Sequence, residues 1–350
     1  MNFVLLSMAK ETINLGVIGV GGIGRVHAYN VAFKVKNAQL MAIADVNRDA
    51  ALNFVKEYKL NNVVIYNDYR KLLENGNIDG VVIATPTFTK KDILIAAADA
   101  GKHIFVEKPL ALNLNDADEM VRHVEKQRVK VLVGYQRRYD RAYALAREAV
   151  SQGKIGTVLI IKSWTRDPPP MPQGWAADPK LSGGRLVDSL THDFDAIRYL
   201  TGLEVSTVYA EGSTLMYDKF KELGDYDHIL VLLRMANGVL GLVEYSGYTP
   251  YGYDTGVEIH GSKGKIIIGM GLRSSLIVIQ GVNYVYDTPT NWIERYEDAY
   301  LNELLDFVDS ILNDREPRCT IYDGRKALEV ALAAWKSIGE KRPVNLPLTI

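Results

Sequence analysis

Two side chains four positions apart, Asp188 and His192, have the types and spacing needed for proton transfer. If residues 184–200 form one helix, both lie on the same face, away from most of the apolar residues. An imidazole accepts a hydroxyl proton near neutral pH, as alcohol oxidation by hydride transfer requires. Asp188 would raise the basicity of the histidine or hold the substrate. The alternative is an ordinary surface pair, because Asp193 and Asp195 show that acids are common in this segment.

A lysine in the tripeptide Glu107-Lys108-Pro109 is the second candidate for chemistry. The tripeptide follows an apolar run at 102–106 that is typical of a buried strand, and in nucleotide-binding sheets such strand ends lie beside the ligand. A partly desolvated ammonium there would hydrogen-bond a substrate hydroxyl and stabilise developing alkoxide charge. The tripeptide alone is a weak indication, because an exposed loop lysine is the ordinary alternative.

This chemistry needs a nicotinamide cofactor, and residues 14–24, Asn-Leu-Gly-Val-Ile-Gly-Val-Gly-Gly-Ile-Gly, predict where it binds. The pattern G-x-G-x-x-G falls between a predicted strand at 15–20 and a predicted helix at 23–33. Its glycines permit a tight turn, close approach of a pyrophosphate and close packing of the helix, whose N-terminus attracts phosphate. The predicted cofactor contacts in this turn are Gly19, Gly21, Gly22, Ile23 and Gly24.

A carboxylate after the second predicted strand, at 39–44, favours one form of the cofactor. Asp45 lies 21 positions beyond Gly24, near the offset of about 20 expected for a residue that binds the adenosine ribose. The alternative is that Asp45 only caps the helix that begins near Arg48. A carboxylate repels a 2′-phosphate, so NAD is favoured, whereas Arg48 keeps NADP as an alternative. Val46 is expected to contact the cofactor beside Asp45.

Strands and helices alternate from residue 10 to residue 134, which predicts an α/β domain of the Rossmann type, with a parallel sheet covered on both faces. Ligands bind beyond the carboxyl ends of such strands. Thr85, Pro86, Glu107 and Lys108 follow predicted strands and complete the expected cofactor contacts. Tyr135 follows the last strand and is expected to contact the substrate.

Residues 135–350 predict a second, α+β domain for substrate binding and oligomerisation. Seven strands are predicted after residue 205, the last two at 275–280 and 283–286, and Asn237-Gly238 between two apolar runs indicates a hairpin. The resulting sheet would be mostly antiparallel. Alternation is poor at 239–243, so we expect burial of both faces, the second against another subunit. Amphipathic helices are predicted at 296–312 and 322–339.

Bulk composition excludes several classes of protein. The 350 residues suffice for two cores, and the net charge of −1 shows no basic excess for nucleic acid or anionic membranes. No apolar run reaches the roughly 18 residues of a membrane span. The single cysteine, Cys319, excludes an intrachain disulfide framework, fits a reducing compartment such as the cytoplasm, and is expected to be buried. Residues 1–9 are interpreted as a loose extension rather than a signal peptide.

The histidines do not show the paired spacing of metal ligands, so no metal is assigned. His27 follows the glycines and is interpreted either as a contact to cofactor or substrate or as a solvated histidine at the start of a helix.

Beyond these local patterns, the chain resembles the glucose–fructose oxidoreductase and inositol dehydrogenase family (Gfo/Idh/MocA) over about residues 15–334. The resemblance is carried by the glycine turn with the following Arg-Val-His, and by three further motifs. These are Glu-Lys-Pro-Leu-Ala at 107–111, Gly-Tyr-Gln-Arg-Arg-Tyr-Asp at 134–140, and Gly-Gly-Arg-Leu-Val-Asp-Ser-Leu-Thr-His-Asp-Phe-Asp at 183–195. The resemblance implies a Rossmann domain, a mostly antiparallel α/β domain, and a dimer or tetramer.

The nearest branch looks like inositol 2-dehydrogenase, and the resemblance implies that Lys108, Asp188 and His192 are catalytic, with the histidine as general acid and base. Arg166 lies in a segment similar to that branch. Residues 168–180 depart from it in length and content, and Trp175 in this loop is expected to cover the substrate, or else only to pack within the loop. Arg138 is expected to bind substrate, or else to pair with an acid such as Asp140.

We therefore expect an NAD-dependent dehydrogenase acting on a cyclic polyol or sugar, without a nucleic-acid or membrane partner. One alternative is an NADP-dependent aldose 1-dehydrogenase or ketosugar reductase. Another is a non-catalytic nucleotide-binding regulatory protein, which the joint presence of Lys108, Asp188 and His192 disfavours, since a sensor needs no group for proton transfer.

Overall fold

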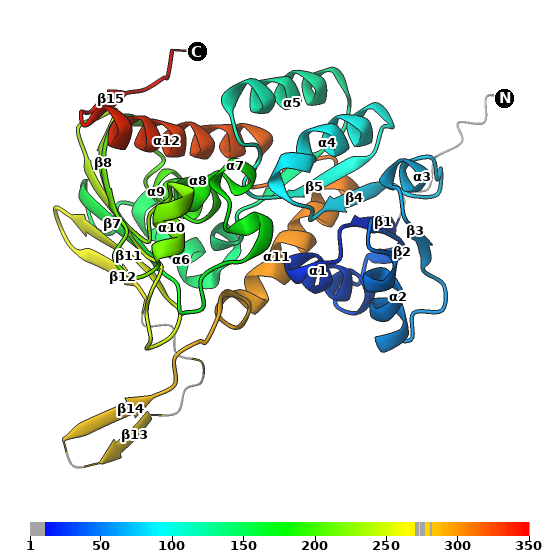
Figure 1. The fold of residues 1–350 in the computed structure, drawn as a ribbon, viewed down its shortest axis with the longest axis horizontal. Helices are drawn as coiled ribbons and strands as arrows, with labels where there is room; N and C mark the ends of the chain where they lie inside the picture. The colour runs from blue at the N-terminus through cyan, green and yellow to red at the C-terminus, as the bar shows by residue number, and fades with distance from the viewer. Residues whose placement is uncertain (1–10, 270–272, 274–276, 281, 350) are drawn as a thin grey trace.

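The computed structural model describes residues 11–269, 273, 277–280 and 282–349, in which two sheets stand side by side with helices around them (Figure 1). The first sheet is parallel and six-stranded, in the order β3-β2-β1-β4-β5-β6. Its strands are β1 (Ile13–Ile18), β2 (Ala38–Ala44), β3 (Val64–Tyr66), β4 (Gly80–Ile83), β5 (His103–Glu107) and β6 (Val131–Gly134).

The helices of this half are α1 (Gly22–Phe33), α2 (Arg48–Glu57), α3 (Tyr69–Leu73), α4 (Lys90–Asp99), after the single turn η1 (Thr87–Thr89), and α5 (Leu114–Lys126). Strands β4 and β6 are buried at every residue, as parallel strands covered on both faces must be. The predicted Rossmann topology is confirmed. The strand order reverses between β1 and β4, and ligands bind at such a point.

The second sheet has seven strands in the order β12-β11-β7-β10-β9-β8-β15. They are β7 (Val158–Arg166), β8 (Val205–Ser213), β9 (His228–Met235), β10 (Leu240–Ser246), β11 (Asp254–Gly261), β12 (Lys265–Ile268) and β15 (Val344–Asn345). Strands β7 and β10 are parallel, and the other pairs are antiparallel, as predicted for most of the sheet. The predicted hairpin at Asn237-Gly238 joins β9 to β10, with Gly238 at φ +92°.

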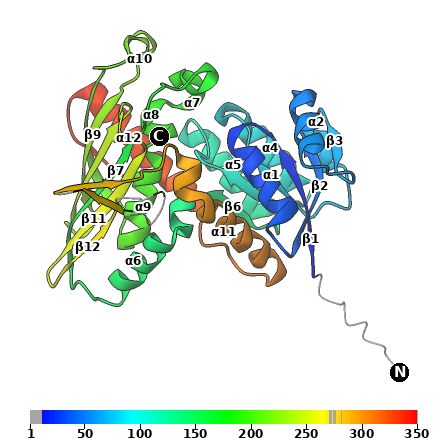
Figure 2. The same ribbon diagram turned by 90° about the horizontal axis from the view of Figure 1, so that it is seen from below.

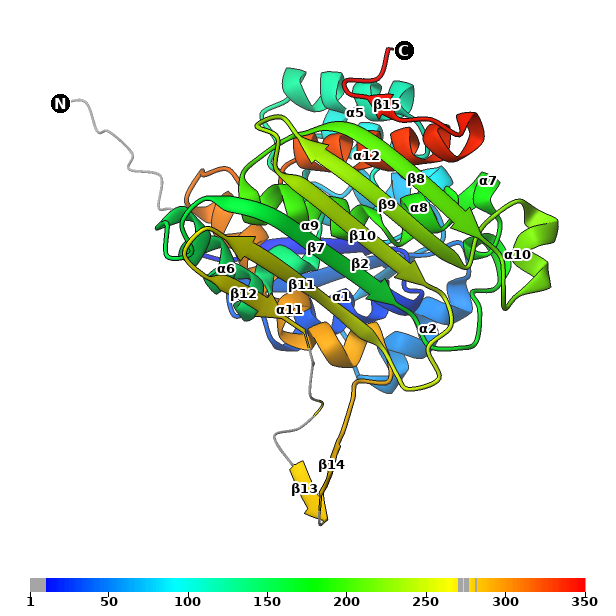
Figure 3. The same cartoon turned by 90° about the vertical axis from the view of Figure 1, so that its left-hand side faces the viewer.

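The remaining elements are η2 (Gln136–Tyr139), α6 (Arg141–Ser151), η3 (Gly174–Ala176), α7 (Pro179–Ser182), α8 (Gly184–Asp188), α9 (Thr191–Thr201), α10 (Asp218–Leu223), α11 (Trp292–Leu312) and α12 (Ile321–Glu340). A hairpin of β13 (Ile277–Gln280) and β14 (Asn283–Tyr286) extends away from the body (Figures 1 and 3). The predictions for residues 1–9 and for the start of the strand at 275–280 lie outside the described residues.

The predicted single helix at 184–200 is wrong, because the chain breaks at Ser189 and Leu190 between α8 and α9. The Thr191 hydroxyl donates to the Val187 carbonyl at 2.7 Å, which a regular helix would reserve for the backbone amide of Thr191. The Leu190 amide donates to the Arg185 carbonyl, five residues back, rather than to the carbonyl of Leu186 as in a regular helix. Asp188 and His192 therefore belong to two short helices.

One face of the second sheet is packed against helices and the other is open (Figure 3). Along β9 buried and exposed residues alternate, and Leu230, Leu232 and, on β10, Leu240 are exposed on the open face. Within one chain only the inner face is buried, so burial of the open face by another subunit stays a prediction.

The last two long helices return to the first sheet. Helix α11 packs against α1, β1 and β5, and α12 packs against α5 and β6 (Figures 1 and 2). Cys319, between them, is buried as predicted. The division into domains at 134/135 stays a prediction. Among the described residues no helix has the length and apolar character to cross a bilayer.

Candidate active site

A single cavity of about 1460 Å³ joins the carboxyl ends of β1, β4 and β5 to the inner side of the second sheet. The glycine turn, Asp45 and Val46 line one end. Thr85, Pro86, Glu107 and Lys108 continue the lining, and Asp188 and His192 lie on the opposite wall. Lys108 follows β5 of the first sheet, whereas His192 lies on α9, which packs against the second sheet. Both side chains line the same cavity.

The glycine turn leaves room for a diphosphate. Gly19 has φ +88°, which favours glycine, whereas a Cβ on Gly21 or Gly22 would meet nothing within 4 Å. Backbone amides at the start of α1 are thus open to the cavity. Gly24 does not line the cavity, because its Cα packs against Gly19, where a Cβ would collide with the carbonyl oxygen. The direct cofactor contact predicted for Gly24 is replaced by this close packing.

Asp45 is held at the rim of the cavity by the backbone. Its Oδ2 accepts a hydrogen bond from the Val20 amide and its Oδ1 one from the Asn47 amide, each at 2.8 Å. These bonds fix the carboxylate where an adenosine ribose would reach the remaining lone pairs. Arg48 does not line the cavity.

The catalytic candidates Lys108 and Asp188 are directly connected. The Lys108 ammonium donates to the Asp188 carbonyl at 2.8 Å and lies 3.7 Å from Asp188 Oδ1, and Arg185 lies 3.2 Å from Asp188 Oδ2. Burial raises the pKa of Asp188, but the charges of Lys108 and Arg185 outweigh it and leave the pKa below its ordinary value. The carboxylate is therefore ionised and orients Lys108. Among the described residues it does not bond His192, so the predicted direct tuning of the imidazole is absent.

His192 is a neutral imidazole in this cavity. Burial lowers its pKa well below the ordinary value, and the charges of Lys108 and Arg137 lower the pKa further. Its Nδ1 has no hydrogen-bond partner in the described part of the chain, and Tyr135 packs edge-on against the ring at 5.7 Å. A neutral imidazole that lines the cavity is ready to accept a proton.

The backbone of the turn Glu107-Lys108-Pro109 is fixed by Lys90, a residue that the sequence did not indicate. The ammonium of Lys90, buried at the start of α4, donates to the carbonyls of Glu107, Lys108 and Pro109 at 2.8, 2.8 and 3.0 Å. Burial lowers the pKa of Lys90 to about 7, partly offset by the charge of Glu107. No motif in the sequence distinguishes Lys90 from the surface residue Lys91.

Two predicted substrate contacts, Tyr135 and Arg138, are buried behind the cavity rather than in its lining. Tyr135 supports the ring of His192. Arg138 donates to both carboxylate oxygens of Asp195 at 2.8 and 2.7 Å, and pairs with Asp323 at 2.9 Å. The structural ion pair is thus the correct alternative for Arg138, but its partner is not Asp140, which pairs with Arg295.

Arg166 also lies outside the lining, because side chains alternate along β7. Its guanidinium pairs with Glu244 and Asp254, each at 2.7 Å, whereas the neighbours Thr165 and Asp167 line the cavity. Asp167 accepts a hydrogen bond from Tyr245 at 3.1 Å, and burial raises its pKa. The alternation of side chains along β7 places Thr165 and Asp167, rather than Arg166, on the side of the cavity. Trp175 does line the cavity.

A dinucleotide turn with a carboxylate beside it, and an ammonium and a neutral imidazole lining the same cavity, are the features of a nicotinamide-dependent dehydrogenase of alcohols. Residues 13–135 match the family described as "Oxidoreductase family, NAD-binding Rossmann fold", and residues 147–346 match "Oxidoreductase family, C-terminal alpha/beta domain". The chain belongs to this Gfo/Idh/MocA oxidoreductase family, and its cofactor is NAD.

Several relatives match almost end to end. Myo-inositol 2-dehydrogenase of Thermotoga maritima is 39% identical, over 95% of this chain and 98% of the relative. NAD(+)-dependent scyllo-inositol 2-dehydrogenase of Bacillus subtilis is 34% identical, over 96% and 97%. The structure of scyllo-inositol dehydrogenase from Lactobacillus casei with NAD(H) and scyllo-inositol superposes with a TM-score of 0.88 at 29% identity, over 95% and 99%.

Proposed function

We propose that this dehydrogenase oxidises a ring hydroxyl of an inositol, with Lys108, Asp188 and His192 as its catalytic residues. The observation that carries the proposal is that Lys108 and His192 line one cavity together with the cofactor turn. The names of the relatives, which act on myo- and scyllo-inositol, support the substrate class.

Each residue has a defined task in this reaction. NAD supplies the hydride acceptor when it is bound. The neutral His192 takes the hydroxyl proton, and the Lys108 ammonium stabilises the negative charge that develops on the oxygen. Asp188 keeps the ammonium in place through its carbonyl and carboxylate.

Neighbouring hydroxyls of the ring need further partners. Asp167 and Thr165 at the end of β7 offer oxygens on the same wall, and Trp175 offers an apolar cover. We propose that these three side chains contact the substrate, in place of Tyr135, Arg138 and Arg166.

The protein is further proposed to work as a dimer or tetramer in the cytoplasm. The open apolar face of the second sheet supports association through this sheet. A single buried cysteine is compatible with a reducing compartment.

The proposal is tested by measuring NADH formation from myo-, scyllo- and chiro-inositol and from aldoses, with NAD and with NADP. We expect an inositol with NAD to give the highest kcat/KM. In His192→Ala, turnover should fall by about 10² or more, while NADH titration gives an unchanged dissociation constant. An aldose preferred over every inositol, or full turnover in His192→Ala, would contradict the proposal.

A further inference from the structure

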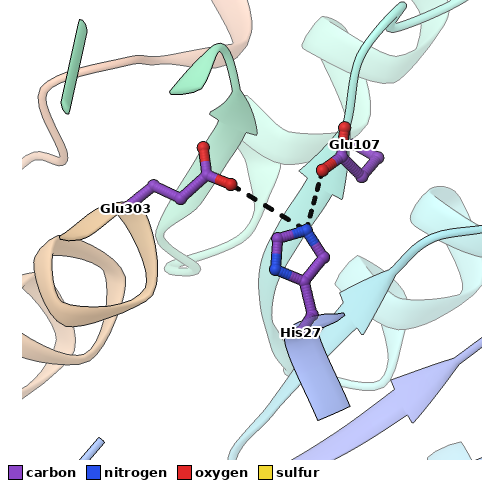
Figure 4. Close-up of side chains that lie close together, drawn as sticks. All are labelled: His27, Glu107 and Glu303. Carbon is purple, nitrogen blue, oxygen red and sulfur yellow. Dashed lines mark hydrogen bonds and ion pairs between the residues drawn. The ribbon is translucent and has the colours of Figure 1, made fainter. Parts of the chain in front are cut away.

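Three ionisable side chains are buried together behind the turn that carries Lys108, and the proposed reaction does not use them (Figure 4). His27 comes from α1, Glu107 ends β5, and Glu303 comes from α11. Their exposed fractions are 0%, 5% and 0%. The ligand atoms of this cluster all lie within 4.8 Å of one another. His27 is thus neither solvated nor part of the cavity lining, contrary to both predictions for it.

The two carboxylates have different surroundings. Glu107 Oε1 lies 2.7 Å from His27 Nε2, and its Oε2 accepts a hydrogen bond from the Lys108 amide at 3.1 Å. Neither oxygen of Glu303 has a hydrogen-bond partner among the described residues, and its distance from His27 Nε2 is 3.8 Å. The Glu107 carboxylate therefore has a hydrogen-bond partner at each oxygen, as a buried carboxylate needs, whereas the Glu303 carboxyl group has none among the described residues.

The groups around the cluster supply little positive charge. Tyr300 of α11 and the ring of Phe105 contact His27, and Tyr139 of η2 donates to Asp306. Lys90 of α4 bonds backbone carbonyls, including that of Glu107, rather than the carboxylates of the cluster, and Lys108 extends to Asp188. Two buried carboxylates beside one imidazole, one of them without a hydrogen-bond donor among the described residues, are not both expected to be ionised at neutral pH.

We propose that the cluster stores one proton on Glu303 as a neutral carboxylic acid, and that His27 and the ionised Glu107 position Lys108 for catalysis. His27 donates from Nε2 to Glu107, which leaves Nδ1 as an unprotonated acceptor without a partner. Glu107 in turn fixes the backbone amide of Lys108. Burial and the charge of Glu107 raise the pKa of Glu303 well above its ordinary value, in agreement with this assignment.

A bound divalent cation is the competing occupant for this set of side chains. The 2.7 Å separation of His27 Nε2 and Glu107 Oε1 is that of a direct hydrogen bond. An ion would have to replace this bond, so the geometry favours the proton.

The first experiment measures the melting temperature from pH 5 to pH 8 in the full-length protein and in Glu303→Gln. A folded chain that keeps a proton which the unfolded chain releases near pH 4.3 loses stability as the pH rises. The melting temperature of wild type should therefore fall, relative to that of Glu303→Gln, by roughly 2 °C for each unit by which the pH rises. Glu297→Gln, exposed on the same helix, should follow wild type. Parallel curves for wild type and Glu303→Gln would overturn the proposal.

The second experiment rests on the proposed inositol oxidation, whereas the melting curves do not. Glu303→Gln, which mimics the neutral acid, should keep kcat within about twofold, whereas His27→Ala should lower kcat about tenfold or more with KM for NAD unchanged. Elemental analysis after dialysis against EDTA should find no stoichiometric metal. One metal ion per chain that is lost in Glu303→Gln, or full kcat in His27→Ala, would overturn the proposal.

Discussion

Lys108 and His192 line the same cavity but need different protonation states for the proposed reaction. The ammonium must stay charged to stabilise an alkoxide, and the imidazole must stay neutral to accept a proton. The Asp188 carboxylate pairs with the ammonium, and burial together with the ammonium keeps the pKa of His192 low. The neighbouring cation thus keeps the imidazole unprotonated, and Asp188 holds that cation in place.

At the residue scale, we expect Asp45 to favour NAD over NADP by binding the adenosine ribose. In Asp45→Ser the ribose loses a charge-assisted hydrogen bond, worth about 1.5–3 kcal/mol, so KM for NAD should rise about tenfold or more while KM for NADP rises less. Initial-rate measurements with both cofactors check this expectation. Asp49→Ser, on the exposed side of α2, is the matched control and should leave both constants unchanged. An equal increase of KM for NAD and for NADP in Asp45→Ser would disprove the contact between Asp45 and the ribose.

At the scale of elements, α4 fixes the turn that ends β5. All three N–H bonds of the Lys90 ammonium are used on successive carbonyls of that turn. An apolar side chain cannot replace these hydrogen bonds. The position of Lys108 therefore depends on a helix start as well as on its own strand.

In Lys90→Met the three carbonyls lose their donor, and each buried group left without a partner costs about 1–3 kcal/mol. The melting temperature should fall, and kcat should drop about tenfold because Lys108 is no longer held in place. Calorimetry and steady-state kinetics measure the two effects. Lys91→Met next to it removes only partly exposed pairs with Asp116 and Glu119 and should change neither quantity appreciably. Unchanged kcat in Lys90→Met would show that the turn is rigid without the ammonium.

Local patterns predicted most elements because each depends on its own residues. The apolar runs of β4 and β6, the glycine turn and the Asn237-Gly238 hairpin are examples. The break before Thr191 could not be predicted, because neither proline nor glycine marks it in the sequence, and it is visible only in turn bonds such as that from the Leu190 amide to the Arg185 carbonyl. Likewise Arg138 and Arg166 resemble site residues in sequence, and only the folded chain brings Asp195 and Glu244 to them.

At the scale of the whole molecule, the open face of the second sheet exposes several apolar side chains. Leu232 on β9 is opposite Leu242 on β10 and Tyr209 on β8, and Leu230 and Leu240 extend the same apolar area. Exposed apolar areas of this kind are typical of interfaces between subunits. The ion pairs of Arg166 with Glu244 and Asp254 lie on the same face, and we expect them at the rim of the proposed contact between subunits.

Light scattering after gel filtration should therefore give a multiple of the 39.0 kDa chain mass. In Leu232→Asp a charge enters the centre of the open face, and the mass should shift towards that of one chain because the substitution acts on both partners of a symmetric contact. Leu145→Asp, an equally exposed leucine on α6, should keep the mass of wild type. A monomeric wild type would disprove association through this face.

The return of α11 to the first sheet has a consequence for how NAD exchanges. Glu303 on this helix meets His27 and Glu107 in the interior, and Lys108 reaches across to Asp188. Because α11 contacts both η2 and the first sheet, wide hinge opening between the two sheets would have to break packing of this helix as well as the bond from Lys108 to Asp188. We therefore expect the nucleotide to enter and leave through the mouth of the cavity, which the proline-rich loop before Trp175 lines.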